Sequence, residues 1–179
     1  AKTLFPYTTL FRSMTSKVIP IPQLVGFTER NGSWYVEDIP LADLAKEFGT
    51  PLYVYSKKAL ANAYQAYDRA CVDSSGKRRA RVHFAMKANS NLAVIDCFRK
   101  LGAGFDLVSG GELARALAIG ADPKSLVFAG VGKSASEIAQ ALEAGVKCIN
   151  VESIAELEQI NRVATKLDCR APISLRVNP

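Results

Sequence analysis

A regular alternation of short apolar runs with helical patterns constrains the fold of this chain more than any other feature of its sequence. The runs VHFAM, FDLVS, SLVFAG, KCINV and ISLRV begin at intervals of about 23 residues, and segments with helical spacing of apolar residues lie between them. Strands that alternate with helices at short, even spacing form a parallel sheet with right-handed crossovers. The sequence therefore predicts an α/β fold.

Three junctions between a run and the next helix carry the same helix-start pattern, a serine followed three residues later by a glutamate. The pairs are Ser109 with Glu112, Ser134 with Glu137, and Ser153 with Glu156. In a capping box, the serine oxygen and the glutamate side chain satisfy backbone N–H groups that the first helical turn leaves without partners. The pattern therefore predicts where strands end and helices begin.

The periodicity leaves two closures open for this sheet, a (β/α)8 barrel and an open doubly wound sheet. In both, ligands bind at the carboxyl ends of the strands, so the residues that close each run are the candidates for a functional site. These candidates are Lys87, residues 106–109, residues 130–133, Glu152 and residues 176–178.

The residues at these strand ends allow two interpretations, imine formation by a lysine and dinucleotide binding by a glycine-rich turn. Lys87 closes the run VHFAM, and a lysine amine at this edge can form an imine with a carbonyl compound. Residues 130–135, GVGKSA, match the dinucleotide-binding pattern G-x-G-x-x-A, and Glu152 follows about twenty residues later, as in a Rossmann-type dehydrogenase. However, two strand–helix units precede this match, whereas the fingerprint normally opens its fold. The glycines therefore favour a tight turn before a capped helix.

Other classes of site have little support in the composition. The only histidine, His83, stands at the start of a run, so no Ser-His-Asp or Cys-His arrangement can form at the carboxyl edge. The four cysteines are widely separated and form no C-x-x-C pair, which predicts free thiols in a reducing cytoplasm and no metal site. They are Cys71, Cys97, Cys148 and Cys169.

Charge and hydropathy predict a soluble protein without a nucleic-acid or membrane partner. The formal net charge is +6, and the one basic cluster, residues 77–81, lies in a polar stretch without interleaved aromatic residues. We therefore expect a solvated turn there. No charge-free run is long enough to span a bilayer.

Residues 1–13 look unlike the rest of the chain. They carry two positive charges and aromatic residues but lack the continuous apolar core of a secretory signal, and Met14 follows at once. We expect residues 1–13 to be a non-native leader that makes few contacts and can be deleted without changing folding.

The segment after Met14 predicts a mixture of short elements before the α/β pattern begins. An Asn-Gly turn at Asn31, strands over residues 34–36 and 52–55, and a helix over residues 41–48 are expected, followed by an amphipathic helix over residues 56–71. This pattern divides the chain into the leader, an N-terminal segment over residues 14–50, and the α/β portion over residues 51–179.

Five segments, in matching order and spacing, resemble one known family. They are HFAMKANSN, GFDLVSGGEL, VFAGVGKS, NVES and SLRVNP, and over about residues 40–179 they resemble the diaminopimelate decarboxylase branch of the alanine-racemase-like fold. The resemblance implies a TIM barrel that binds pyridoxal phosphate, with about five of its eight strands in this chain. It also implies that the N-terminal segment joins a β domain.

The resemblance implies roles for three residues. Lys87 matches the lysine that binds pyridoxal phosphate covalently, Asp106 matches an acid near that lysine, and Arg176 matches an arginine at a later strand end close to the cofactor. It gives Lys133 and Glu152 no role beyond turn and capping structure.

The activity implied for the intact protein is decarboxylation of the amino acid meso-2,6-diaminopimelate to L-lysine by a cytoplasmic homodimer, with the present fragment inactive. A related decarboxylase of ornithine, arginine or carboxynorspermidine, and a pyridoxal-phosphate-binding barrel without activity, are the alternatives. In this family, the residues that distinguish these substrates are expected beyond Pro179.

Overall fold

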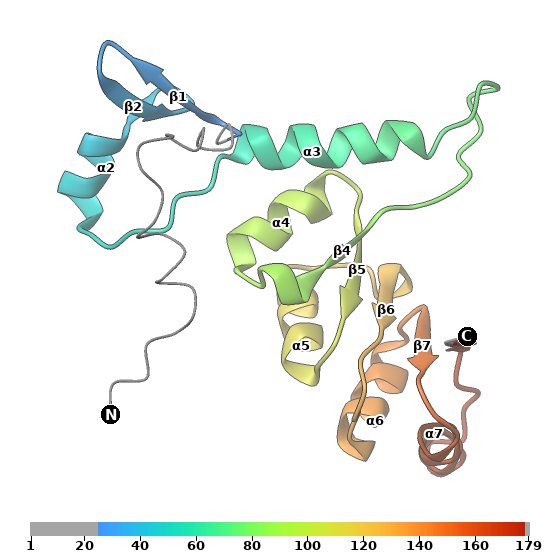
Figure 1. Ribbon diagram of the computed structural model, residues 1–179. Helices are drawn as coiled ribbons and strands as arrows, with labels where there is room; N and C mark the ends of the chain where they lie inside the picture. Colours follow the sequence, from blue (N-terminus) through green and yellow to red (C-terminus); the bar gives the residue numbers. More distant parts are fainter. Residues whose placement is uncertain (1–24, 178–179) are drawn as a thin grey trace, which may run out of the picture. The chain divides into compact units, whose positions relative to one another are not determined.

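The computed structural model describes residues 25–177, which fall into two compact units, one ending at Ser56 and the other beginning at Lys57. Figure 1 shows the elements of each unit along the chain. The expected leader over residues 1–13 lies outside the described residues. Among residues 25–177, no helix is long and apolar enough to cross a membrane.

The first unit contains a small antiparallel sheet and one helix. Strands β1 (Phe27–Arg30) and β2 (Ser33–Val36) form a hairpin, and β3 (Ile39–Pro40) pairs with β2 before α2 (Leu41–Phe48) begins. Asn31 and Gly32 both have positive φ, 51° and 76°, as a two-residue hairpin turn requires. The Asn-Gly signal and the helix over residues 41–48 are thereby confirmed.

The strand expected over residues 52–55 is wrong. These residues belong to no strand, and the side chains of Leu52, Tyr53 and Tyr55 are exposed. Their β-forming composition was the basis of the prediction, but β propensity takes effect only where a neighbouring strand and a packed face are present.

The second unit begins with α3 (Lys57–Ala70), which confirms the amphipathic helix expected over residues 56–71. The chain then turns over residues 73–76, where the Gly76 backbone N–H donates to the Asp73 carbonyl at 3.0 Å, and the basic cluster of residues 77–81, where a turn was expected, follows this turn instead of forming it. Arg78 donates two hydrogen bonds to the Asp68 carboxylate, at 2.7 and 2.9 Å, and Arg79 pairs with Asp73. These arginines therefore contact carboxylates of their own unit.

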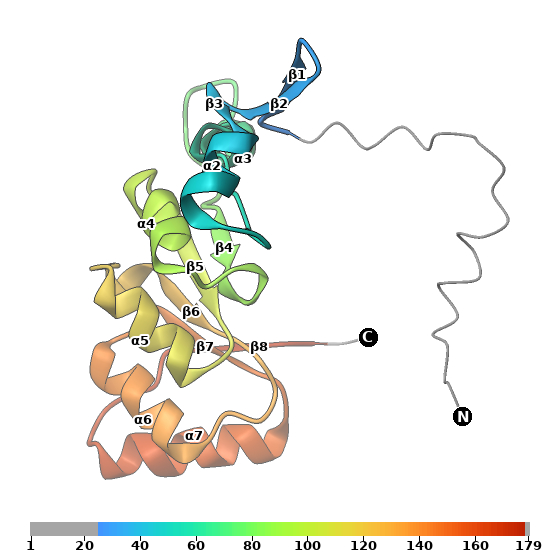
Figure 2. The same ribbon diagram turned by 90° about the vertical axis from the view of Figure 1, so that its left-hand side faces the viewer.

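The core of the second unit is a five-stranded parallel sheet whose strands lie side by side in chain order (Figures 1 and 2). Its strands are β4 (His83–Ala85), β5 (Gly104–Leu107), β6 (Leu126–Phe128), β7 (Cys148–Val151) and β8 (Ile173–Leu175). The helices that connect them are α4 (Leu92–Lys100), α5 (Gly110–Ala118), α6 (Ala135–Ala144) and α7 (Ile154–Lys166), with 3-10 turns η1 (Met86–Ala88) and η2 (Pro123–Ser125). A doubly wound sheet would reverse its strand order, so the prediction of a barrel section is confirmed.

The two faces of this sheet differ in chemistry. One face carries large apolar side chains that are fully buried, among them Phe105, Phe128 and Ile149, and the helices lie along it in Figure 2. Phe84 stacks on Phe98 of α4 with ring centroids 4.2 Å apart. The alternate residues face the interior of the barrel section, where Asp106 stands in register with Ala85 and Val127.

We expect the contribution of each apolar side chain on this face to the free energy of unfolding to follow its burial. Leu126 of β6 is fully buried, whereas Leu175 of β8 is 64% exposed, although strand alternation places both on the helix side of the sheet. Leu126→Ala should lower the free energy of unfolding by about 2–5 kcal/mol, and Leu175→Ala by less than about 1 kcal/mol. Urea unfolding followed by circular dichroism measures both, and equal losses would contradict the packing described.

Candidate active site at the carboxyl edge of the sheet

Lys87 lies just beyond the carboxyl end of β4, in the 3-10 turn η1, and its side chain is exposed. The buried side chain of Met86 anchors this turn. Two asparagines of the motif KANSN shape the connection to α4. The Asn89 side chain accepts a hydrogen bond from the Asn91 backbone, and the Asn91 side chain caps α4 at the Ala93 backbone (3.0 and 2.9 Å). The motif therefore turns the chain into α4 while the side chain of Lys87 stays exposed.

Asp106 is the inward residue of β5 next to the end of β4. Burial raises the pKa of its carboxyl group above the ordinary value, and the positive charge of Lys87 is the largest effect that opposes this shift. The register of the two strands pairs Asp106 with Ala85, two residues before Lys87. An amine and a carboxyl group with complementary charges thus share the carboxyl edge at β4 and β5.

His83 occupies the opposite end of β4 from Lys87. Its ring packs where Gly104 has no side chain, since a Cβ there would collide with the imidazole and lie 2.8 Å from the Ser125 carbonyl oxygen. Burial lowers the pKa of His83, and its Nε2 is buried without a hydrogen-bond partner among the described residues. His83 is therefore a partly buried residue packed at Gly104, and it is near enough to Asp106 for each group to affect the pKa of the other.

Arg176 follows β8 directly, and its partner is Glu152, which follows β7. The Arg176 backbone N–H donates to the Val151 carbonyl at 3.0 Å, and its Nη1 lies 3.2 and 3.3 Å from the two oxygens of the Glu152 carboxylate. The Glu152 side chain is only 10% exposed, whereas that of Arg176 is 62% exposed. Within residues 25–177, no hydrogen bond or ion pair joins Arg176 to Lys87 or Asp106.

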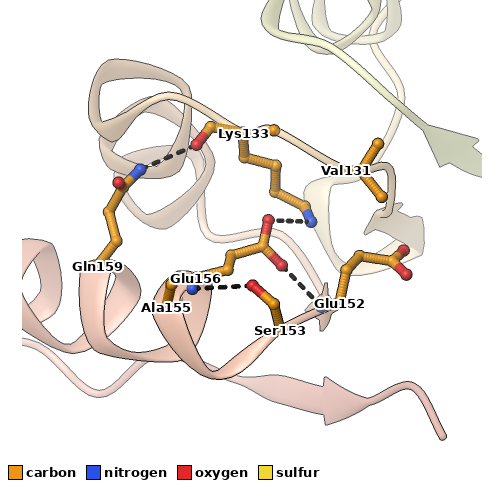
Figure 3. Close-up of a pocket in the computed structure, with 8 residues that line it drawn as sticks. Val131, Lys133, Glu152, Ser153, Ala155, Glu156 and Gln159 are labelled. Carbon is orange, nitrogen blue, oxygen red and sulfur yellow. Dashed lines mark hydrogen bonds and ion pairs between the residues drawn. The ribbon is translucent and has the colours of Figure 1, made fainter.

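Lys133 is the polar residue whose environment the sequence did not indicate. Its side chain is 1% exposed, and its ammonium group donates to the carbonyl oxygens of Gly130 and Asn150 at 2.7 and 2.8 Å. It also donates to Oε1 of Glu156 at 2.9 Å, the contact that Figure 3 shows. The ammonium group has three donors, and all three are used. Lys133 is therefore a buried cross-link between the turn after β6, strand β7 and helix α7.

The expected helix caps are present, but only one is a complete capping box. The Ser109, Ser134 and Ser153 side chains each accept a hydrogen bond from the backbone N–H of the glutamate three residues later. Glu137 completes the box with Ser134, and its other oxygen accepts from the Gly110 backbone at 2.8 Å. In the other two helices, the glutamate reaches back one residue further, to the backbone N–H of Val108 and of Glu152.

The turn that matches the dinucleotide pattern has a structural reason for its glycines. Gly130 and Gly132 have φ values of 91° and 80°, and a side chain on Gly130 would lie 3.2 Å from Cβ of Val108. A pocket of about 310 Å³ opens beside the turn, lined by Val131, Gly132, Lys133, Glu152, Ser153, Ala155, Glu156 and Gln159 (Figure 3). The Lys133 ammonium faces the protein and is fully hydrogen-bonded, so the turn offers no free lysine to a phosphate.

The four cysteines are free thiols, of which Cys169 is exposed and the others are partly buried. In the part of the chain that the structure describes, no group of three or more histidine, cysteine, aspartate or glutamate side chains could hold a metal ion.

Comparison with known proteins identifies the class to which this edge belongs. Residues 57–179 match the family described as the pyridoxal binding domain of pyridoxal-dependent decarboxylases. The chain belongs to this family. Its parallel sheet with connecting helices agrees with that membership.

Within this family, the chain is similar to several diaminopimelate decarboxylases. The chain is 49% identical over 151 residues to the diaminopimelate decarboxylase of Vibrio cholerae, and 52% identical over 145 residues to that of Neisseria meningitidis serogroup A, covering 84% and 81% of this chain. The solved structure of diaminopimelate decarboxylase from M. jannaschii in complex with L-lysine aligns with a TM-score of 0.79 at 37% identity, over 86% of this chain.

These relatives are much longer than the chain. The chain spans 35% of the length of each of the two bacterial enzymes and 36% of the M. jannaschii chain.

The raised pKa of Asp106 predicts a pH-dependent cost of its ionisation. A carboxyl group whose pKa is raised on folding stabilises the fold most below its unfolded pKa of about 3.8–3.9, and this contribution is lost as the pH rises through the folded pKa. Asp106→Asn should therefore be more stable than the unaltered chain at pH 7, and the difference should shrink as the pH falls toward 4. Thermal unfolding between pH 4 and pH 7 measures this, and a difference that grows in acid would refute it.

The buried ion pair predicts a large and specific loss of stability. Lys133→Met leaves the Glu156 carboxylate buried without its cation, so the free energy of unfolding should fall by about 3–5 kcal/mol. The control is Arg162→Met, which removes an exposed pair with Glu158 and should cost at most about 1 kcal/mol. Chemical denaturation distinguishes the two, and a loss at Lys133 as small as that at Arg162 would contradict the burial of the pair.

Proposed function

We propose that the protein containing this chain is a pyridoxal-phosphate-dependent decarboxylase that converts meso-2,6-diaminopimelate to L-lysine and CO2. The observation that carries the proposal is that an exposed lysine, Lys87, and a partly buried carboxyl group, Asp106, stand at the carboxyl edge of a parallel sheet in this family, where the charge of Lys87 lowers the pKa of Asp106 against the effect of burial. The identity of about one half to bacterial diaminopimelate decarboxylases supports the choice of substrate.

The residues present fit the part of the cofactor site that this chain would supply. Lys87 presents a primary amine at the strand end, and the inward neighbour Ala85 is small, which leaves space on the barrel side of the sheet. Pyridoxal phosphate, when bound, supplies a ring that accepts the electron pair left behind by the departing carboxylate.

The chain's own groups would hold and orient this cofactor. Lys87 would bind it covalently through the ε-amine, and Asp106 would supply a carboxyl group at the same edge of the sheet. Arg176 contacts Glu152 through Nη1, so its remaining N–H groups are directed elsewhere and can serve an anionic group of the cofactor. These three roles define the proposed site.

The organisation of the whole protein is part of the proposal. Residues 14–50 contribute to a β domain, residues 51–179 form the first part of the barrel, and the protein acts as a cytoplasmic homodimer without nucleic-acid or membrane partners. The resemblance to the family is the support for these statements. Sedimentation of the whole protein at several concentrations tests the dimer, and a monomer throughout would reject it.

A decarboxylase acting on ornithine, arginine or carboxynorspermidine is the alternative from the same fold. Carbon dioxide release from each candidate amino acid, measured at equal concentrations, decides between them. We expect kcat/KM to be highest for meso-2,6-diaminopimelate, and a higher value for another of these amino acids would replace it as the substrate.

The role of Lys87 makes the sharpest test of the proposed chemistry. Lys87→Arg keeps the positive charge but removes the amine that binds the cofactor, because a guanidinium stays protonated and does not form the covalent link. In the whole protein, this variant should lose the visible absorbance of the bound cofactor and all turnover while keeping its circular dichroism spectrum.

Lys166→Arg is the matched control for this test, since Lys166 is exposed at the end of α7. It should keep both the absorbance and the turnover. Borohydride reduction in the presence of pyridoxal phosphate should attach the cofactor to Lys87. If the label were found on another lysine and Lys87 were spared, the proposed site would be wrong.

A further inference from the structure

A chain of contacts runs along the carboxyl edge of the sheet from the buried Lys133 to the exposed Arg176. Oε1 of Glu156 accepts from the Lys133 ammonium at 2.9 Å, and Oε2 accepts from the backbone N–H of Glu152 at 2.8 Å (Figure 3). The carboxylate of Glu152 then accepts from Arg176. One buried carboxylate therefore holds both the lysine and the backbone that carries the partner of Arg176.

This arrangement is more elaborate than a helix cap requires. Glu112 makes the same reach back to the backbone before its helix, yet the lysine is found only at Glu156 among the three capping glutamates of the described chain. The side chains of Lys133 and Glu156 are 1% and 8% exposed. A buried ion pair adds little net stability over apolar side chains of similar size, so its presence calls for a reason other than stability.

The contacts around the pair set the position of Glu152. Lys133 also donates to the carbonyl of Asn150, so the backbone on both sides of Val151 is held, at Asn150 by the ammonium and at Glu152 by the carboxylate. Gln159 binds the Lys133 carbonyl at 2.9 Å and keeps the turn against α7. The last link in the series is the largely exposed side chain of Arg176.

We propose that Lys133 and Glu156 are positioning residues for the cofactor site, which act by holding Glu152 where its carboxylate orients Arg176. This inference rests on the proposed function, because Arg176 is assigned to the cofactor there. Neither Lys133 nor Glu156 touches the cofactor. Their effect is on how tightly Arg176 contributes to cofactor binding.

The test uses Glu156→Gln in the whole protein and measures the dissociation constant of pyridoxal phosphate from its absorbance. The carboxylate accepts one donor on each oxygen, whereas an amide has one acceptor and one donor, so either Lys133 or the Glu152 N–H loses its partner. We expect the dissociation constant to rise about tenfold, which corresponds to the loss of one charge-assisted hydrogen bond. Exchange of the Glu152 amide hydrogen should also become faster.

A second variant guards against simple misfolding. Lys133→Met combined with Glu156→Met removes both charges with side chains of similar length, a replacement that buried pairs often tolerate, yet leaves the Glu152 N–H without an acceptor. It should weaken cofactor binding as Glu156→Gln does. Glu137→Gln is the control, because Glu137 starts α6 with the same Ser-x-x-Glu pattern but holds the Gly110 backbone instead; it should bind the cofactor normally.

Coupling to Arg176 separates positioning from a general structural effect. Arg176→Gln should weaken cofactor binding by a similar factor, and adding Glu156→Gln to it should cause no further loss. The inference would be overturned if the losses from Arg176→Gln and Glu156→Gln multiplied, or if Glu156→Gln and the double methionine variant both bound the cofactor normally. Labelling of Lys87 in the unaltered protein would then leave the proposed function standing. If the unaltered protein failed to take up the cofactor through Lys87, the proposed function and the inference would both fall.

Discussion

The fold depends on burial of the apolar face of the five-stranded sheet by the helices that connect its strands. Phe105, Leu107 and Leu126 have no exposed surface, and each helix from α4 to α7 contributes buried apolar residues to the same core. Burying one such side chain stabilises a fold by about 1.5–3 kcal/mol, more than any single polar contact at the surface. This one-sided burial leaves the inward face free to carry polar residues.

Hydrogen bonds and ion pairs join the polar groups that follow neighbouring strands at the carboxyl edge. Glu137 in the first turn of α6 binds the backbone of Gly110 at the start of α5, and Lys133 in the turn after β6 binds Glu156 in the first turn of α7. Arg176, which follows β8, binds Glu152, which follows β7. A functional group on a loop needs such support to keep a defined geometry. The edge therefore combines exposed groups, such as Lys87 and Arg176, with nearly buried ones, such as Lys133 and Glu152.

Much of the fold was predictable from local pattern. Even spacing of apolar runs and three Ser-x-x-Glu signals predicted the alternation of strands with helices and the helix starts, because both patterns depend on residues close together in the chain. The spacing alone left the strand order open, since that order depends on pairing between strands distant in the chain. The strand expected over residues 52–55 failed for the same reason, since a strand exists only with a partner. The role of Lys133 was also missed, because its partner Glu156 lies 23 residues away and is met only when β6 and β7 are neighbours.

The sequence by itself determined that Lys87, Asp106 and Arg176 stand at strand ends, since the alternation of strand and helix places them there. Only the tertiary structure decided which groups surround each of them and how those groups shift its pKa or pair with its charge. Asp106 has a raised pKa because neighbouring strands remove water from it, and Arg176 meets Glu152 because β7 and β8 pair in register. Desolvation and charge pairing come from residues distant in the chain, so local sequence pattern carries no record of them.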